Sequence, residues 1–168
     1  MARATIRTKL LVAGSIVLLL IVCGIVLWTA PRWLVPYLVA RAPGCLYSVE
    51  TTASRVALTI DDGPDTATTA GLLHVLHAHQ ARATFFLISG HITSDSLVEA
   101  MVAQGHEIGN HLTRDEPSIR LSATAFDSSL AEAGRRLSAF APVRWARPGR
   151  GRYDQRMVSG MGRQWYGG

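Results

Sequence analysis

The sequence predicts an α/β fold built on a parallel sheet and preceded by one helix that is apolar and long enough to span a membrane. Three observations support this prediction. Residues 10–30 carry no charge, short apolar runs alternate with helical patterns over 55–157, and polar clusters follow the predicted strands. Such alternation is typical of βαβ units, in which the carboxyl ends of the strands form the active face.

The uncharged run, LLVAGSIVLLLIVCGIVLWTA, spans about 30 Å as a helix, which matches the hydrocarbon core of a bilayer. It has no polar face, so it is interpreted as a membrane segment or a signal peptide rather than a core helix. A cleaved signal peptide needs small residues before its cleavage site, whereas the bulky Trp28 lies two positions before Ala30 and Pro31 follows it. We therefore expect an uncleaved single-pass anchor at 10–30, with residues 1–9 in the cytoplasm and the rest of the chain on the other side. Cleavage would instead give a secreted protein.

Prolines and a glycine break regular structure after the anchor, so residues 31–54 are predicted to form a stem. VALTI and the nearly continuous apolar run ATFFLI predict the first two strands, the second buried on both faces. Three segments with apolar stripes predict helices, and the glycine-rich residues 158–168 predict neither a strand nor an amphipathic helix. In chain order, the predicted domain contains a strand at 56–60, a helix at 66–79, a strand at 83–88, a helix at 95–104, a strand at 107–110, a helix at 123–140 and a fourth strand at 142–146.

The charge distribution argues against nucleic acid as a partner. The net charge is +5 and the pI is near 9.9, a balance that raises the question of nucleic acid. The basic excess lies at the two ends, in 1–50 and 144–168, whereas 51–143 contain six basic and ten acidic side chains. Because Cys23 lies in the apolar run, the two cysteines predict no intrachain disulfide framework.

Two adjacent carboxylates, Asp61 and Asp62, follow the first predicted strand in the sequence TIDDGP. Neighbouring side chains on a strand point to opposite faces, so the Gly-Pro turn is needed if both are to serve one site. Like charges this close repel each other unless a cation or an arginine lies between them. A solvent-exposed Asp-Gly turn is the alternative, and the pair alone does not decide between the two.

His111 and Asp115 lie four residues apart after the third predicted strand, a spacing that places them on one side of a helical turn. Imidazole and carboxylate are zinc ligands, but one His near one Asp is more often a surface pair, and Pro117 disfavours a helix here. Arg147 follows the fourth predicted strand. It is expected either to hold a carboxylate through charge-assisted hydrogen bonds or to lie in a solvated basic turn.

Together these motifs resemble those of the polysaccharide deacetylases of the NodB-homology type, carbohydrate esterase family four. TIDDGP resembles the first motif of that family, HEIGNH followed by a ligand four residues later the second, and RPGRG the third, while ATFFLISG resembles its second strand. The resemblance implies a deformed (β/α) barrel, with a partial deacetylase domain at 55–157 and a non-matching tail at 158–168. The barrel is expected to be incomplete because the fourth motif and the late Leu-x-His motif of the family are absent, for which a truncated or frame-shifted gene product is the simplest explanation.

The resemblance also implies roles for individual residues. Asp61 is the general base, Arg147 orients and charge-pairs it, and the metal ligands are Asp62, His111 and Asp115. The family usually has a His at the position of Asp115, so the carboxylate predicts a weaker preference for zinc and more competition from harder cations. Zinc is the first expectation, with cobalt, manganese or iron as alternatives.

Two functions remain open at this level. The first is metal-assisted hydrolysis of N-acetyl groups on a polysaccharide of the N-acetylglucosamine type, such as chitin or peptidoglycan. The second is a catalytically inactive, truncated membrane protein that at most binds metal or glycan, because the motif that supplies the general acid is absent. The other histidines are interpreted as a solvated helix side (His74, His77 and His79) or as surface residues (His91 and His106).

Overall fold

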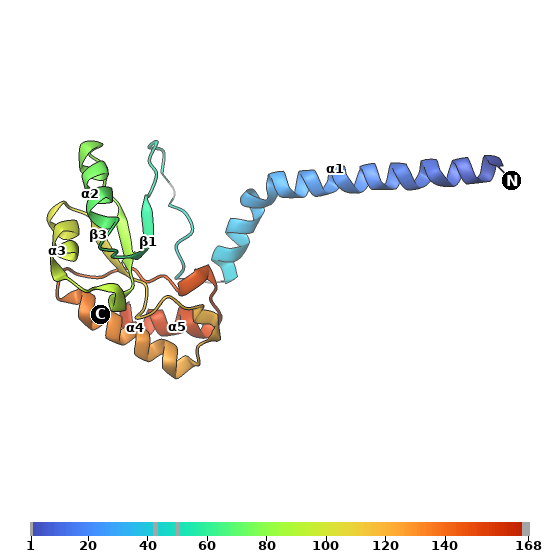
Figure 1. Cartoon of the computed structure of the whole chain (residues 1–168). Coiled ribbons are helices and arrows are strands. Elements are labelled where there is room, and N and C mark those ends of the chain that lie inside the picture. The colour runs from blue at the N-terminus through green and yellow to red at the C-terminus, as the bar shows by residue number, and fades with distance from the viewer. Residues whose placement is uncertain (1, 42–43, 50, 166–168) are drawn as a thin grey trace. The chain divides into compact units, whose positions relative to one another are not determined.

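The computed structural model of the chain describes residues 2–41, 44–49 and 51–165. It divides into two compact units, Met1–Glu50 and Thr51–Gly168. The first unit contains one long helix, α1 (Ala2–Arg41), which is the long blue coil in Figure 1. By length and composition its segment Val12–Thr29 can cross a membrane, with a mean hydropathy of 2.6. Signal sequences share these properties, so the choice between an anchor and a signal peptide stays a prediction.

Residues 31–41 were predicted to belong to an irregular stem, and this part of the prediction was wrong. The helix continues through Pro31 and Pro36 to Arg41. A proline removes one helical hydrogen bond and kinks the helix without having to end it, and the ribbon in Figure 1 changes direction along the last part of α1. The guanidinium of Arg41 lies over the ring of Tyr37, 5.0 Å from its centroid, and this contact stabilises the last turn.

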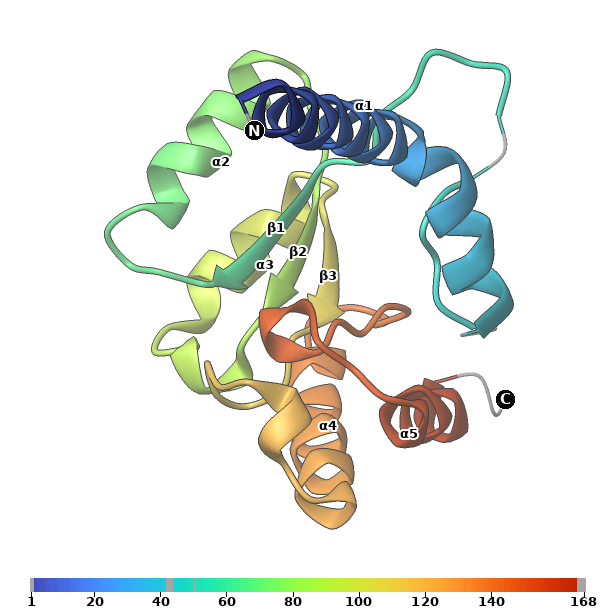
Figure 2. The same ribbon diagram turned by 90° about the vertical axis from the view of Figure 1, so that its right-hand side faces the viewer.

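The second unit is an α/β unit around a three-stranded parallel sheet with the strand order β1-β2-β3. Its elements are β1 (Thr59–Gly63), α2 (Thr69–Ala78), β2 (Thr84–Leu87), the 3-10 turn η1 (Ser89–His91), α3 (Asp95–Ala103), β3 (Glu107–Asn110), the 3-10 turn η2 (Ser118–Arg120), α4 (Ala123–Ser138), the 3-10 turn η3 (Gly149–Gly151) and α5 (Gln155–Trp165). Figure 2 shows the three strand arrows side by side and pointing the same way. The predicted α/β class with a parallel sheet is confirmed.

The core lies between the sheet and the helices α2, α3 and α4. It contains Leu73, Leu76, Ala83, Phe85, Leu87, Val98, Met101, Ile108, Leu137 and Val143. β2 is the central strand, and Phe85, Phe86 and Leu87 are at most 6% exposed. A strand with a neighbour on each edge and apolar side chains on both faces is buried throughout, as the run ATFFLI predicted.

The two strands predicted at the edges of the sheet differ from the structure. β1 begins at Thr59 rather than at residue 56, because its pairing with β2 starts there, and Val56 is 99% exposed. The predicted fourth strand at 142–146 was wrong.

Of these five residues, all of them described, only Ala146 forms a bridge, which pairs it with Asn110. Two backbone hydrogen bonds flank the bridge. The Asn110 N–H donates to the Trp145 carbonyl over 2.8 Å, and the Arg147 N–H donates to the Asn110 carbonyl over 2.9 Å. Two bonds are too few for a strand, yet they fix Arg147 beside the end of β3.

The sequence predicted no helix in residues 158–168. This prediction was also wrong, because α5 covers the segment as far as Trp165. Met157 is 3% exposed and packs with Phe126 and Leu130 of α4, and Met161, one turn later, packs against the same cluster. Glycines lower the intrinsic helix propensity of the segment. Burial of one methionine-bearing side against α4 stabilises the helix instead, and such tertiary stabilisation is not visible in local propensity.

Candidate metal and catalytic site

The candidate site lies at the carboxyl ends of the three strands, which backbone hydrogen bonds tie together. The Ile88 N–H donates to the Gly63 carbonyl over 2.8 Å, and the His111 N–H donates to the Leu87 carbonyl over 2.9 Å. These bonds join the ends of β1 and β3 to the end of β2. Polar residues that follow the strands therefore meet at one edge of the sheet, as expected for parallel α/β folds.

A bulge in β1 directs Asp61 and Asp62 toward one site. Ile60 and Gly63 are both paired with β2, and this step of three residues on β1 faces a step of two on β2. Asp62 has a φ of 68°, in the left-handed region that L-residues rarely adopt. A bulge of this kind bends the strand and re-aims a side chain, so adjacent carboxylates need not point to opposite faces.

Asp61 is held by Arg147. Arg147 Nη1 donates to Asp61 Oδ1 over 2.7 Å and to Thr59 Oγ1 over 3.0 Å. The two charged side chains are each 35% exposed, so the ion pair contributes modestly to stability. Its main effect is to fix the direction of the Asp61 carboxylate.

The ring of Phe86 packs against Arg147, the cationic partner of Asp61, and against His111. The Arg147 guanidinium lies over it, 4.0 Å from the ring centroid, and the His111 ring meets it edge to face at 6.5 Å. A Cβ on Gly109 would lie 2.7 Å from the nearest ring carbon, which is well inside van der Waals contact. Gly109 in β3 therefore leaves space for the Phe86 ring, which Arg147 and His111 both contact.

The tautomer of His111 follows from its partners. Its side chain is 5% exposed, and Nδ1 lies 2.6 Å from the carbonyl oxygen of Arg147. A carbonyl oxygen only accepts, so Nδ1 carries the proton. In the neutral ring Nε2 then presents a lone pair, and it lies 3.3 Å from Asp62 Oδ1. Two acceptors that face each other at this distance repel unless a proton or a metal cation lies between them.

The donor pair fits a divalent metal. Two ligands bound at about 2.0–2.1 Å in a tetrahedral arrangement lie roughly 3.3–3.4 Å apart, which agrees with the 3.3 Å between Asp62 Oδ1 and His111 Nε2. A hydrogen bond from the other ring nitrogen to a backbone carbonyl is the usual support of a metal-binding His. The Asp62 side chain is 65% exposed, so further ligands and substrate can approach from solvent.

Asp115 does not join this pair in the structure. Its carboxylate pairs with Arg150, whose Nη2 lies 3.2 Å from Oδ1 and 3.4 Å from Oδ2. Within the described part of the chain, no cluster of three His, Cys, Asp or Glu side chains has a geometry that could hold a metal. Ligation by Asp115 therefore stays a prediction.

Comparison with known proteins identifies the family. The family model described as polysaccharide deacetylase matches residues 48–164. The chain belongs to the polysaccharide deacetylase family. The predicted NodB-homology type is thereby confirmed.

The relatives of this chain differ in the substrates that their names state. The chain is 39% identical over 74 residues to the peptidoglycan-N-acetylglucosamine deacetylase PgdA of Listeria monocytogenes, a match that covers 44% of this chain and 16% of the relative. It is 43% identical over 70 residues to a chitooligosaccharide deacetylase of a Bradyrhizobium strain, which covers 38% of this chain and 32% of the relative. The matched part therefore spans a third or less of the length of these curated relatives.

One solved structure that is similar to the second unit contains a metal. It is a family 4 acetyl xylan esterase from Clostridium thermocellum in complex with cobalt, with a TM-score of 0.59 and 28% identity. The match covers 62% of this chain and 53% of the esterase. It supports the family fold for the second unit.

Asn110 supports the candidate site although the sequence did not assign it a role. It is fully buried; its Nδ2 donates to the Leu130 carbonyl over 2.9 Å, and its Oδ1 accepts from the Leu112 N–H over 2.8 Å. Leu112 has a φ of 64°, so Asn110 holds the sharp turn that follows His111. The tendency of Asn to bond its own backbone two residues on was the available signal.

His91 and His106 were interpreted as surface residues. His91 is exposed, as interpreted, whereas His106 is buried, so its interpretation was wrong. His91 Nδ1 lies 3.0 Å from the Asp62 carbonyl oxygen, so this histidine touches the site. His106 is 6% exposed and its Nδ1 accepts from the Ala83 N–H over 3.2 Å. Burial lowers the pKa of His106 below its usual range, with a further contribution from the Arg82 charge. Backbone groups supply both partners, and the sequence shows no signal for such contacts.

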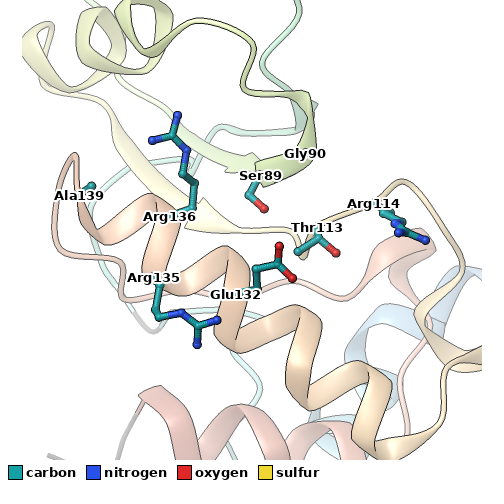
Figure 3. Close-up of a pocket in the computed structure, with 8 residues that line it drawn as sticks. All are labelled: Ser89, Gly90, Thr113, Arg114, Glu132, Arg135, Arg136 and Ala139. Atoms are coloured by element: carbon teal, nitrogen blue, oxygen red, sulfur yellow. The ribbon is translucent and has the colours of Figure 1, made fainter.

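A cavity of about 710 Å³ lies between η1, α4 and the segment that follows β3. It is lined by Ser89, Gly90, Thr113, Arg114, Glu132, Arg135, Arg136 and Ala139, and Figure 3 shows its arginine side chains pointing away from one another. Arg136 pairs with Asp95 of α3. Because the guanidinium groups diverge, the cavity is not shaped around a single anion.

Proposed function

We propose that this chain is a metal-dependent N-deacetylase of polysaccharides of the N-acetylglucosamine type, chitin-like or peptidoglycan-like. In this proposal Asp61 is the base, Arg147 orients it, and Asp62, His111 and Asp115 hold the metal. The observation that carries the proposal is the approach of two lone-pair donors, Asp62 Oδ1 and His111 Nε2, at 3.3 Å beside an arginine-held carboxylate. Zinc is proposed first, with cobalt, manganese or iron as alternatives, since a second carboxylate favours harder cations.

The chain's own residues prepare the reaction. Arg147 holds the Asp61 carboxylate through one charge-assisted hydrogen bond, so that it can take a proton from the attacking water. The carbonyl of the same arginine fixes the tautomer of His111, so one residue positions both the base and a ligand. A bound divalent cation supplies Lewis acidity toward the acetamide carbonyl.

The wider context of the site also belongs to the proposal. We propose that α1 anchors the protein as a single-pass membrane helix, with the deacetylase domain outside the cytoplasm. The three parallel strands are proposed to be the first part of a deformed (β/α) barrel of the NodB-homology type. Fusion of a reporter enzyme to residue 165 would test the orientation, since a periplasm-dependent reporter should be active only if the domain crosses the membrane.

Metal binding is tested first, by calorimetric titration of the full chain in detergent with zinc. Asp62→Ala and His111→Ala are expected to abolish binding, and Asp115→Ala to weaken it, because each substitution removes one of the three proposed ligands. His74→Ala and Asp127→Ala, which change an exposed His and a carboxylate outside the site, serve as matched controls. Absence of zinc, cobalt and manganese binding to the parent chain would end the proposal.

Activity is tested by acetate release from a chito-oligosaccharide, from peptidoglycan glycan strands and from acetylated xylan. The proposal expects release from at least one N-acetyl substrate in the presence of metal, abolished by Asp61→Asn. Metal binding without acetate release would favour the alternative, an inactive protein that binds metal or glycan. That alternative has one specific observation in its favour, because Asp115 is occupied by Arg150 in the structure.

A further inference from the structure

We propose that His91 is a positioning residue that holds Asp62 in the conformation from which its carboxylate meets His111. The inference rests on the proposed metal site and adds to it, because His91 lies outside the three motifs that carry the family resemblance. It assigns a function to a side chain of η1, the turn that follows β2.

The first observation is the hydrogen bond that His91 makes. Its Nδ1 lies 3.0 Å from the Asp62 carbonyl oxygen, and a carbonyl only accepts, so Nδ1–H is the donor. Asp62 is in the left-handed region with a φ of 68°. Aspartate adopts this conformation more readily than most L-residues, but it still costs free energy, which surrounding contacts offset. The hydrogen bond from His91 restrains the peptide group on the carboxyl side of Asp62.

The second observation is that η1 is itself fixed. The Ser89 N–H donates to the Leu112 carbonyl over 3.0 Å, and the Gly90 N–H donates to the Thr113 carbonyl over 3.2 Å. A Cβ on Gly90 would lie 2.4 Å from the Thr113 oxygen, so only glycine permits this approach. His91 is therefore attached to the chain segment that begins with His111.

These contacts form a closed circuit around the donor pair. Backbone hydrogen bonds connect η1 to the segment that follows His111. From η1, His91 donates a hydrogen bond to the Asp62 carbonyl. The Asp62 carboxylate in turn lies 3.3 Å from His111 Nε2. If the bond from His91 is lost, Asp62 can relax from its left-handed conformation. The carboxylate then leaves His111 and the metal loses a preformed pair of ligands.

The experiment measures zinc affinity of the full chain in detergent by competition with a chromophoric chelator. His91→Ala removes the donor, whereas His91→Asn places an amide N–H close to the position of Nδ1. His74→Ala on the exposed side of α2 is the matched control for loss of one histidine. Circular dichroism and the thermal midpoint of the metal-free proteins establish that each variant is folded, and the visible spectrum of the cobalt form reports the geometry of the ligands.

We expect His91→Ala to weaken zinc binding about 10- to 100-fold and to alter the cobalt spectrum. His91→Asn should restore the affinity to within about threefold of the parent, and His74→Ala should leave it unchanged. An unchanged affinity in His91→Ala would overturn the inference, and so would an equal loss in the Ala and Asn variants, which would make His91 a direct ligand. Failure of the parent to bind any metal would instead refute the proposed function, so the two failures are distinguishable.

Discussion

Replacement of the buried Asn110 by Ala provides the most direct test of how the site is held. The substitution removes the acceptor of the Leu112 N–H and the donor to the Leu130 carbonyl. A buried donor left without its partner costs about 1–3 kcal/mol, and the second lost bond about 0.5–1.5 kcal/mol. Asn110 is 0% exposed, so solvent does not replace either partner, and we expect a total loss of about 1.5–4.5 kcal/mol.

Amide hydrogen exchange of the full chain in detergent measures this loss. Because every 1.4 kcal/mol is a factor of ten, exchange through unfolding in the segment 107–115 should accelerate about 10- to 1600-fold in Asn110→Ala. Gln104→Ala, which removes an exposed amide side chain after α3, is the control and should change exchange by less than about threefold. An acceleration in Asn110→Ala no greater than in the control would show that the two side-chain bonds do not hold the turn, and the argument would fail.

Three further predictions concern other contacts of the second unit. Gly90→Ala should destabilise it by about 1–3 kcal/mol in urea unfolding, since the new Cβ would lie 2.4 Å from a backbone oxygen, whereas Gly71→Ala in an open position of α2 should stabilise it by about 0.5–1 kcal/mol. Burial lowers the pKa of His106 in the folded state. As the pH drops below about 6.5, the unfolded state therefore takes up a proton before the folded state does, and the free energy of unfolding should decrease. His106→Asn should flatten this pH dependence, and an equal slope in both proteins would contradict the prediction. A double-mutant cycle of Arg147→Ala and Asp61→Ala should give a coupling of about 0.5–1.5 kcal/mol in metal-free protein, reduced by partial exposure, and a coupling near zero would show that the pair is not formed in solution.

The sequence predicted the elements whose signal is local. The apolar run ATFFLI predicted the central strand because burial on both faces requires continuous apolar residues. The helices at 95–104 and 123–140 were found within two residues at each end. The placement of Asp61, His111 and Arg147 at one edge of the sheet followed from a rule of parallel folds, and the motifs TIDDGP, HEIGNH and RPGRG were sufficient for the family.

Other features depended on contacts between distant segments. Whether residues 142–146 form a strand depended on how many backbone groups meet β3, and whether 158–165 form a helix depended on the apolar surface that α4 offers to Met157 and Met161. Neither property is encoded in the local pattern of the segment concerned. In residues 158–165, burial against α4 outweighs a weak helix propensity. In residues 142–146, a strand-like local pattern forms no strand because only one residue pairs with β3.

By itself the sequence determined the family, the parallel α/β class and the side chains available for chemistry. Only the tertiary structure decided which of those side chains meet. A bulge in β1 places the Asp62 carboxylate beside His111, and a backbone carbonyl 36 residues away in the chain determines the tautomer of His111. Asp115 forms an ion pair with Arg150. The physical reason is that these decisions are made largely by backbone carbonyls and by φ angles, which every residue type possesses, so they carry no signature in the sequence of side chains.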